Sequence, residues 1–533
     1  MGIKVNWGIA LLAVLLAGCG KPMPDEFKRL DPETRALRQD VNMFAWDVMD
    51  TYYLWRDEIS PAMDAWQNWE EPIAKIAAIR YKDAAGEDID RWTELTDDFA
   101  AMKGGISGYT RTLGMDFSLY YVDKNRQKVC AVVTYVYADS PAAKAGLGRG
   151  DVILTLDGRE MTPDNYRDLV RSTLLGGGTV RLGLDGGAGL TVTAVDMYEN
   201  PVHTVRILDR PDGRKVGYLH YTSFTLDSCK ELSNVFRSFT QEGIDDLVLD
   251  LRYNGGGYVT AETVLASMLA PVREVEAKSV FSREVYNESL AEELDDKPTC
   301  FDTGFTFHVN DALQVVTTKG CNPDLKRLYV LVTGGSASAS ESLICGLKPY
   351  MDVILVGNRT YGKYCAGLLI NAENWLDSVK KYLKDGDFER AQPHLDNWGL
   401  YVMYARYADC NGVTLSMPDG IAPDVELDDD PLDGHPLGDP DETLLSAALA
   451  LMDGGPVSGG TRTAEGGTVS GGTRAADGGP VSGGTRAADG GNPVETGRPT
   501  GGVSPSASPA LLPVPDAPRR PGFGLLVGNR PVN

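Results

Sequence analysis

The stretch LYVLVT (328–333), followed by GGSASASE (334–341), decides the fold, because it predicts a buried strand that turns directly into a helix. We expect the apolar helix to begin at about Ser342. A turn of small residues at this junction exposes a serine hydroxyl and points the first helix amides at a developing oxyanion. A serine-rich helix cap with Glu341 in the first turn explains one serine but not three. A serine of this turn is therefore a candidate nucleophile.

A serine nucleophile needs a base, and Lys363 fits this role better than any histidine. The five histidines lie in no recognisable motif. Lys363 follows the predicted strand 353–357 within TYGKY (360–364), and no acidic residue lies between Gly357 and Asn371. Burial without a nearby carboxylate lowers the pKa of a lysine by roughly 3–5 units. Taken alone, the motif fits a surface lysine on a tight turn equally well.

Short apolar runs alternate with helical stretches on both sides of these motifs. The predicted strands are 216–221, 246–251, 328–333 and 353–356, and the predicted helices between them include 228–241 and 260–268. This alternation predicts an α/β fold with a mostly parallel sheet that is buried on both faces. The second predicted strand ends in DLRYNGGG (250–257), whose glycines let the backbone approach a ligand closely. No Lys-Ser or Lys-Thr follows, which excludes a P-loop.

A β-rich region precedes the α/β part. Residues 117–121 and 130–137 are predicted strands, SPAAKAGL (140–147) is a short capped helix, and GDVIL (150–154) is a turn that enters another strand. Asp157-Gly158 predicts a hairpin. This run resembles the bacterial PDZ domain, and we assign residues 113–200 to it.

PDZ domains add a peptide to a sheet edge and hold its terminal carboxylate in a loop of backbone N–H groups. The resemblance places this loop at Gly114, Met115, Asp116 and Phe117. The usual loop is apolar at its third position, whereas Asp116 would repel a carboxylate. Capture of a C-terminal carboxylate therefore remains open.

The motifs occur in an order that resembles that of the C-terminal processing, or tail-specific, peptidases. The order is the PDZ run, GYL (217–219), DLR (250–252), SASASE (336–341), Gly362-Lys363 and MPDGIAPD (417–424). The resemblance implies a ClpP/crotonase-like α/β core over residues 204–452. It also implies that Ser338 is the nucleophile and Lys363 the base, with oxyanion donors at Ala339 and at Gly256 or Gly257. Many members place a glutamine four residues after the lysine to orient it, and here that position is Gly367.

The ends of the chain differ from its middle. Residues 1–18 are a predicted signal peptide that ends in a lipobox, so Cys19 is a predicted lipidation site and 19–31 a tether. Residues 32–112 form a predicted helical domain, which we interpret as a cap that buries its own aromatic residues. Residues 453–533 are a predicted flexible tail, rich in glycine, serine and proline and containing a twelve-residue repeat. We therefore expect a membrane-anchored lipoprotein of the bacterial cell envelope.

Composition limits the partners. The net charge of −24 argues against a nucleic-acid partner. The cysteines form no C-x-x-C pair and have no histidine at zinc spacing, so we expect no metal site and no cofactor. Seven cysteines besides Cys19 leave at least one free thiol. We expect a serine endopeptidase acting on unstructured polypeptide ends; the alternative is a peptide-binding scaffold whose catalytic pair is vestigial.

Overall fold

The computed structural model of the chain describes residues 23–122, 125–293, 298–309, 312–415, 417–455, 457, 461–462, 512–514 and 526–527. Cys19 with its predicted lipobox and nearly all of the predicted repeat tail lie outside these residues. Within the described ranges, no helix is long and apolar enough to cross a membrane. The seven cysteines of the described part form no disulfide.

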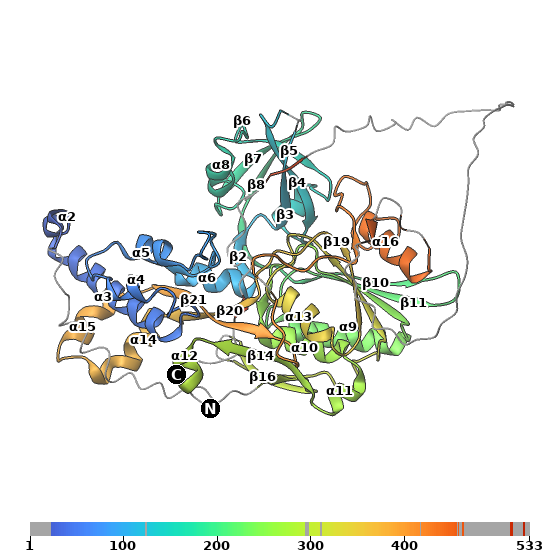
Figure 1. Ribbon diagram of the computed structural model, residues 1–533. Coiled ribbons are helices and arrows are strands. Elements are labelled where there is room, and N and C mark those ends of the chain that lie inside the picture. The colour runs from blue at the N-terminus through green and yellow to red at the C-terminus, as the bar shows by residue number, and fades with distance from the viewer. Residues whose placement is uncertain are drawn as a thin grey trace, which may run out of the picture.

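A mostly parallel sheet forms the centre of the molecule and is covered by helices on both faces (Figure 1). β11, β12, β18, β19 and β22 are parallel, and β10 is antiparallel to β11 at one edge. The strands are β10 Val202–Asp209, β11 Lys215–Tyr221, β12 Asp246–Asp250, β18 Arg327–Val332, β19 Asp352–Gly357, β22 Val425–Glu426 and β23 Thr461–Arg462. Helices α9 Ser228–Glu242, α10 Val259–Leu269 and α13 Ala339–Leu347 pack on one face, and α16 Thr443–Met452 packs on the other. The predicted α/β class and its strands are confirmed.

A second, smaller sheet lies beside the first. Its longest strand, β21 Gly399–Ala408, pairs with β20 Cys365–Asn371, β14 Val280–Tyr286 and β1 Glu94–Thr96. Its remaining strands are β13 Gly257–Tyr258, β15 Thr299–Cys300 and β25 Leu526–Val527. The remaining core elements are α11 Val272–Glu276, α12 Glu288–Glu293 and the hairpin β16 Gly304–Val309 and β17 Ala312–Thr317.

The region predicted to resemble a PDZ domain folds around its own hydrophobic core. Its elements are β3 Met115–Tyr121, β4 Val129–Val136, α7 Pro141–Lys144, β5 Val152–Leu156, β6 Arg159–Glu160, α8 Tyr166–Ser172, β7 Thr179–Leu184 and β8 Gly189–Thr193. The Ser140 hydroxyl caps α7 by accepting from the Ala143 N–H at 3.1 Å. A ribbon of β2 Tyr109–Thr112 and β9 Val195–Tyr198 connects this unit to the rest of the chain. β24 Leu512–Pro513 pairs with the outer edge of β3.

The N-terminal helices do not form a separate cap. They are α2 Asp25–Arg29, α3 Pro32–Tyr52, α4 Ser60–Asp64, α5 Pro72–Ile79 and α6 Phe99–Ser107. Their buried aromatic residues belong to the same hydrophobic core as the α/β part, because β1 joins the second sheet and α3 packs on β21. The aromatic residues are buried as interpreted, but in a core that is shared with the α/β part and not in one of their own.

A segment between β20 and β21 also packs on the N-terminal helices (Figure 1). It contains α14 Ala372–Val379, η1 Lys380–Tyr382, α15 Asp387–Ala391 and η2 Gln392–His394. The Trp375 indole N–H donates to Asp47 on α3 at 2.7 Å, and its ring lies 5.4 Å from that of Phe44. His394 and Arg390 both bond to Asp40 of the same helix, at 2.6 and 2.8 Å. The segment and α3 therefore stabilise each other.

We predict that Trp375→Ala lowers the free energy of opening of α3 by about 3–5 kcal/mol, because a large buried ring is lost. Trp375→Phe keeps most of the buried area and removes only the donor to Asp47, so we expect a loss of about 1–3 kcal/mol. Hydrogen exchange of the α3 amides measures both values, with the β4 amides as an internal control that should not change. Unaltered α3 protection in Trp375→Ala would contradict the stabilising role of the segment.

Candidate active site

Ser338 occupies a strained turn between β18 and α13. Its φ of 62° and ψ of −114° lie in a region that non-glycine residues adopt at a cost of about 1–3 kcal/mol. The residue is fully buried and caps α13, which begins at Ala339 rather than near Ser342 as predicted. The sharp turn brings Ser338 against the loop after β12, where a Cβ atom on Gly256 would lie 2.7 Å from the Ser338 Cβ. Only a glycine fits there.

The other two serines of the motif anchor the turn. The Ser336 hydroxyl donates to the Leu251 carbonyl at 2.8 Å, and the Ser340 hydroxyl donates to the Asn254 carbonyl at 2.9 Å. Both acceptors belong to the stretch DLRYNGGG, so the two predicted strand-end motifs meet. These bonds explain why three serines occur together: two hold the turn in place, and the third, Ser338, faces the lysine.

Lys363 is fully buried next to Ser338. Its Nζ lies 3.4 Å from Ser338 Oγ and 3.3 Å from the Tyr401 hydroxyl, and 5.5 Å from the centre of the Trp92 ring. Burial lowers the pKa of Lys363 from 10.5 to about 8, although Cys365, Asp90 and Glu341 act weakly in the opposite direction. The structure therefore brings together the predicted pair in the desolvated setting that a neutral amine requires.

Glu341 connects the serine turn to the lysine loop. Its buried carboxylate accepts hydrogen bonds from the Ser338 and Lys363 backbone N–H groups, both at 2.9 Å, from the Gly362 N–H at 2.7 Å and from the Thr360 hydroxyl at 2.6 Å. Burial nevertheless raises the pKa of Glu341 above 4.5. The sequence indicates only that Glu341 lies in the first helical turn, because three of its four partners lie about twenty residues further along the chain.

The predicted oxyanion donors differ in their surroundings. The Ala339 N–H stands in the first turn of α13, where backbone N–H groups have no partner inside the helix. The Gly256 N–H instead donates to the Asn254 side chain at 2.9 Å, so it is already engaged. Gly257 lies in β13, opposite Leu526 of β25. Both glycines therefore stay candidate donors.

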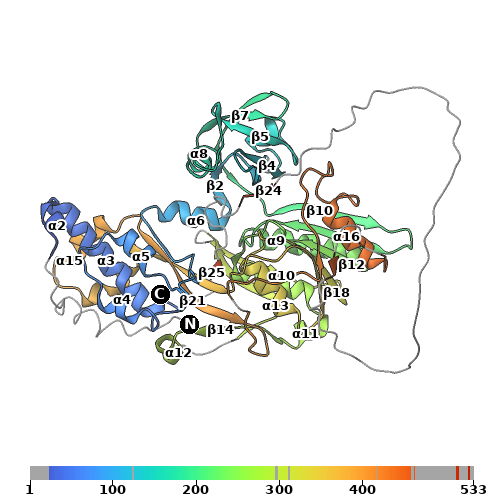
Figure 2. The ribbon, with the colours of Figure 1, turned by 45° about the horizontal axis from the view of Figure 1, so that its top comes forward.

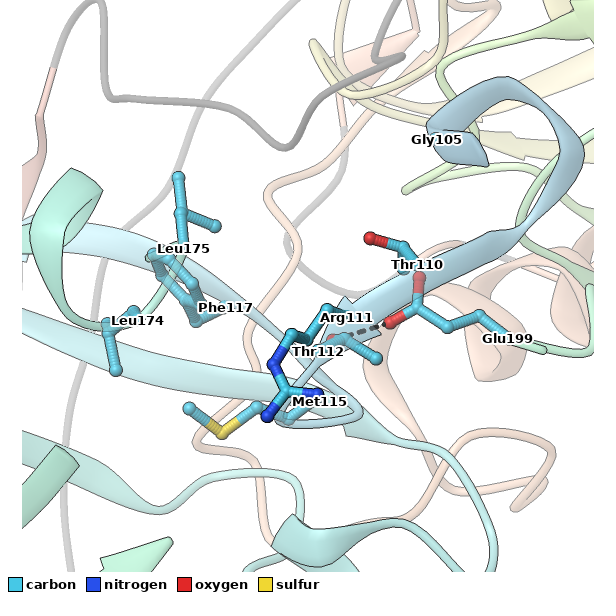
Figure 3. A pocket seen from close by; sticks show the side chains of 9 residues that line it. All are labelled: Gly105, Thr110, Arg111, Thr112, Met115, Phe117, Leu174, Leu175 and Glu199. Carbon is cyan, nitrogen blue, oxygen red and sulfur yellow. Dashed lines mark hydrogen bonds between the residues drawn. The ribbon is translucent and has the colours of Figure 1, made fainter. Parts of the chain in front are cut away.

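A pocket lies beside the predicted peptide-binding loop (Figure 3). Met115 and Phe117 line it together with Leu174 and Leu175, and Arg111 supplies a positive charge. Its other lining residues are Gly105, Thr110, Thr112 and Glu199.

Two residues of the predicted loop are not among those that line the pocket. The Asp116 carboxylate accepts a hydrogen bond from Thr134 on β4 at 3.3 Å. The Gly114 N–H is engaged with the Thr112 hydroxyl at 3.0 Å.

Two short segments from the end of the chain add strands near these sites. Leu512 and Pro513 pair with β3 in the antiparallel direction, and the Val514 N–H donates to the Leu119 carbonyl at 3.0 Å. β25 pairs with β13 and β20, the strands that carry Gly257 and Gly367 (Figure 2). Both edges therefore accept an extended polypeptide.

Comparisons with known proteins agree with this architecture. Residues 215–427 match peptidase family S41 and residues 132–175 match the PDZ domain. The chain is 27% identical to a C-terminal processing peptidase, chloroplastic, from Tetradesmus obliquus over 62% of each chain. It is 24% identical to a carboxyl-terminal-processing protease from Picosynechococcus sp. over 79% of this chain and 92% of the relative.

A solved structure extends the likeness to the fold. The crystal structure of a putative S41 protease from Bacteroides fragilis matches 77% of this chain and 97% of its own, with 25% identity and a TM-score of 0.55. The chain therefore carries a peptidase S41 domain that matches over residues 215–427, with a PDZ domain ahead of it that matches over residues 132–175.

Proposed function

We propose that the chain is a serine endopeptidase that cleaves polypeptides at or near unstructured C-terminal ends through an acyl-enzyme at Ser338. The observation that carries the proposal is the 3.4 Å approach of Lys363 Nζ to Ser338 Oγ inside a fully buried site. The pKa of about 8 gives Lys363 a usable neutral fraction near neutral pH. The match to peptidase family S41 and the similarity to C-terminal processing relatives support the peptidase reaction over a scaffold whose catalytic pair is vestigial.

The chemistry follows from the positions of these atoms. The Ser338 proton moves to neutral Lys363 Nζ while Oγ bonds to the peptide carbonyl carbon, and the N–H groups of Ala339 and of Gly256 or Gly257 stabilise the oxyanion. The Lys363 ammonium then gives its proton to the leaving amine as the C–N bond breaks. In deacylation, a water molecule gives a proton to Lys363 Nζ and its oxygen bonds to the ester carbon. Lys363 then returns that proton to Ser338 Oγ as the bond from Oγ to the carbon breaks.

The proposed substrate is an extended polypeptide. The edge of β3 carries β24, and the edges of β13 and β20 carry β25, so both positions accommodate a chain through backbone hydrogen bonds. The pocket beside β3 is lined by apolar side chains together with Arg111 and Glu199, and Arg111 is paired with Asp196, so the lining suits an apolar side chain of a peptide. A folded substrate would not reach a nucleophile that is fully buried. We therefore infer that unstructured ends are preferred.

We expect Ser338→Ala and Lys363→Ala each to lower kcat/KM on an unstructured polypeptide by at least about 10³-fold, because nucleophile and base act as one unit. The exposed residues Ser238 and Lys348 provide matched controls, and Ser238→Ala and Lys348→Ala should keep wild-type activity. Cleavage is followed by mass spectrometry, and circular dichroism checks that each variant is folded. Unchanged cleavage by Ser338→Ala would refute the proposal, whereas an inactive wild type that binds peptide would favour the scaffold.

We predict that kcat/KM rises with pH through about 8 and then levels off, because only neutral Lys363 accepts the serine proton. The groups that face Lys363 and raise its pKa, Cys365, Asp90 and Glu341, do so too weakly to cancel the effect of burial. Acylation of Ser338 by a small fluorophosphonate should follow the same curve, which separates the base from ionisation of the peptide. A flat acylation profile between about pH 6 and pH 9 would argue against Lys363.

We also propose that Cys19 is lipidated and anchors the protein in a bacterial cell envelope. Stable anchoring requires more than one acyl chain, which a lipobox cysteine receives. Cys19→Ala should move the protein from the membrane fraction to the soluble fraction and abolish labelling with a clickable fatty acid. Cys410→Ala, within the folded part, should keep both properties. Membrane retention of Cys19→Ala would disprove the anchor.

A further inference from the structure

A lysine base must be aimed as well as deprotonated. Its amino group lies at the end of a flexible chain of four carbons, so a second contact is needed to direct the nitrogen lone pair of the neutral amine at the serine hydroxyl. The family resemblance places a glutamine for this purpose four residues after the lysine. In this chain that position is Gly367, which has no side chain to supply the contact.

The Tyr401 hydroxyl lies where such a contact is needed. It is 3.3 Å from Lys363 Nζ, as close as Ser338 Oγ at 3.4 Å. Tyr401 is fully buried on β21 and is held on both sides, because Leu369 of β20 and Glu94 of β1 are its pairing partners. Strands on either side fix the backbone of Tyr401, so its ring has a defined place.

Gly367 makes room for that ring. A Cβ atom at Gly367 would lie 2.6 Å from the Tyr401 hydroxyl oxygen and still closer to the ring carbons. A real Cβ atom does not tolerate such contacts, so a side chain at 367 and the present position of Tyr401 exclude each other. The missing glutamine and the buried tyrosine are thus two parts of one arrangement.

We propose that Tyr401 is the positioning residue that orients Lys363 toward Ser338, in the space that Gly367 leaves open. This inference rests on the proposed function of the pair. Tyr401 acts through Lys363 and does not touch the substrate.

The chemistry of a phenol suits this task. Neutral Lys363 has two N–H groups and one lone pair, and the Tyr401 oxygen accepts one N–H, which leaves the lone pair to face Ser338 Oγ. After proton transfer the ammonium keeps the same bond to Tyr401. A carboxylate in this place would hold the proton on Lys363 and raise its pKa strongly, whereas a neutral hydroxyl orients the amine with a much smaller effect on that pKa.

Tyr401→Phe removes the hydroxyl and keeps the ring in place. We expect kcat to fall about 10–100-fold with little change in KM, since the base is misaligned while peptide binding is untouched. The acid limb of the kcat/KM profile should also move to lower pH, because the ammonium loses an acceptor while Asp90, Cys365 and Glu341 stay in place. A purely structural role of Tyr401 would not move this limb.

Tyr407 provides a matched control. It is buried on the same strand, and its hydroxyl has no hydrogen-bond partner within the described part of the chain. Tyr407→Phe should therefore keep the wild-type kcat and pH profile.

A glutamine at 367 tests the spatial argument. Gly367→Gln alone should lose activity, because its side chain collides with Tyr401. Tyr401→Ala should also lose activity, since it removes the orienting hydroxyl. The double variant Gly367→Gln/Tyr401→Ala should regain at least about tenfold in kcat over Tyr401→Ala, because the amide oxygen fills the vacated space and accepts from Lys363.

The failure of this inference is separable from failure of the proposed function. A Tyr401→Phe enzyme with wild-type kcat and pH profile, while Ser338→Ala is inactive, would overturn the role of Tyr401 alone. Equal losses in Tyr401→Phe and Tyr407→Phe without a shift of the acid limb would overturn it as well. Cleavage by Ser338→Ala would instead refute the Ser338–Lys363 pair.

Discussion

The carboxylate of Glu341 is the contact on which the active site depends. Four donors from two separate loops converge on it, and they satisfy a buried charge that would otherwise be costly. Because Glu341 binds the backbone N–H of Lys363 and not its Nζ, it fixes the distance between Lys363 and Ser338 without holding the amine proton. One acidic residue thus connects Ser338 and Lys363, the proposed nucleophile and base, while Lys363 keeps its lowered pKa.

A second buried charge cluster holds the PDZ domain against the peptidase core. Arg252, directly after β12, bonds to Asp250, Glu442 and Asp429, and Arg149 of the PDZ domain reaches the same Asp429 at 3.1 Å. Separating these parts would leave buried charges without partners, which is strongly unfavourable. The loop from Arg252 to Gly257 is therefore tied at one end to the PDZ domain and at the other to the serine turn.

Local patterns made much of this structure predictable. The strands, the PDZ-like run and the two motifs around Ser338 and Lys363 each depend on neighbours within a few residues. The roles of Glu341 and Tyr401 escaped prediction, since their partners in the lysine loop are 19 to 38 residues away and meet them only through packing. The glycine at 367 did signal a departure, but a missing side chain does not reveal which distant residue fills its space.

The N-terminal region also contributes to the site through packing of residues that are far apart in the sequence. Trp92 covers Lys363 Nζ, and nearby Asp90 is engaged by the Tyr53 hydroxyl and by the N–H groups of Trp92 and Thr93. These bonds hold the Asp90 carboxylate in place, and its charge raises the pKa of Lys363 less than burial lowers it. Without the Trp92 ring over it, water would reach Lys363 Nζ and the pKa of Lys363 would return toward 10.5. The segment just before β1 therefore helps to set the basicity of a residue more than 250 positions later in the chain.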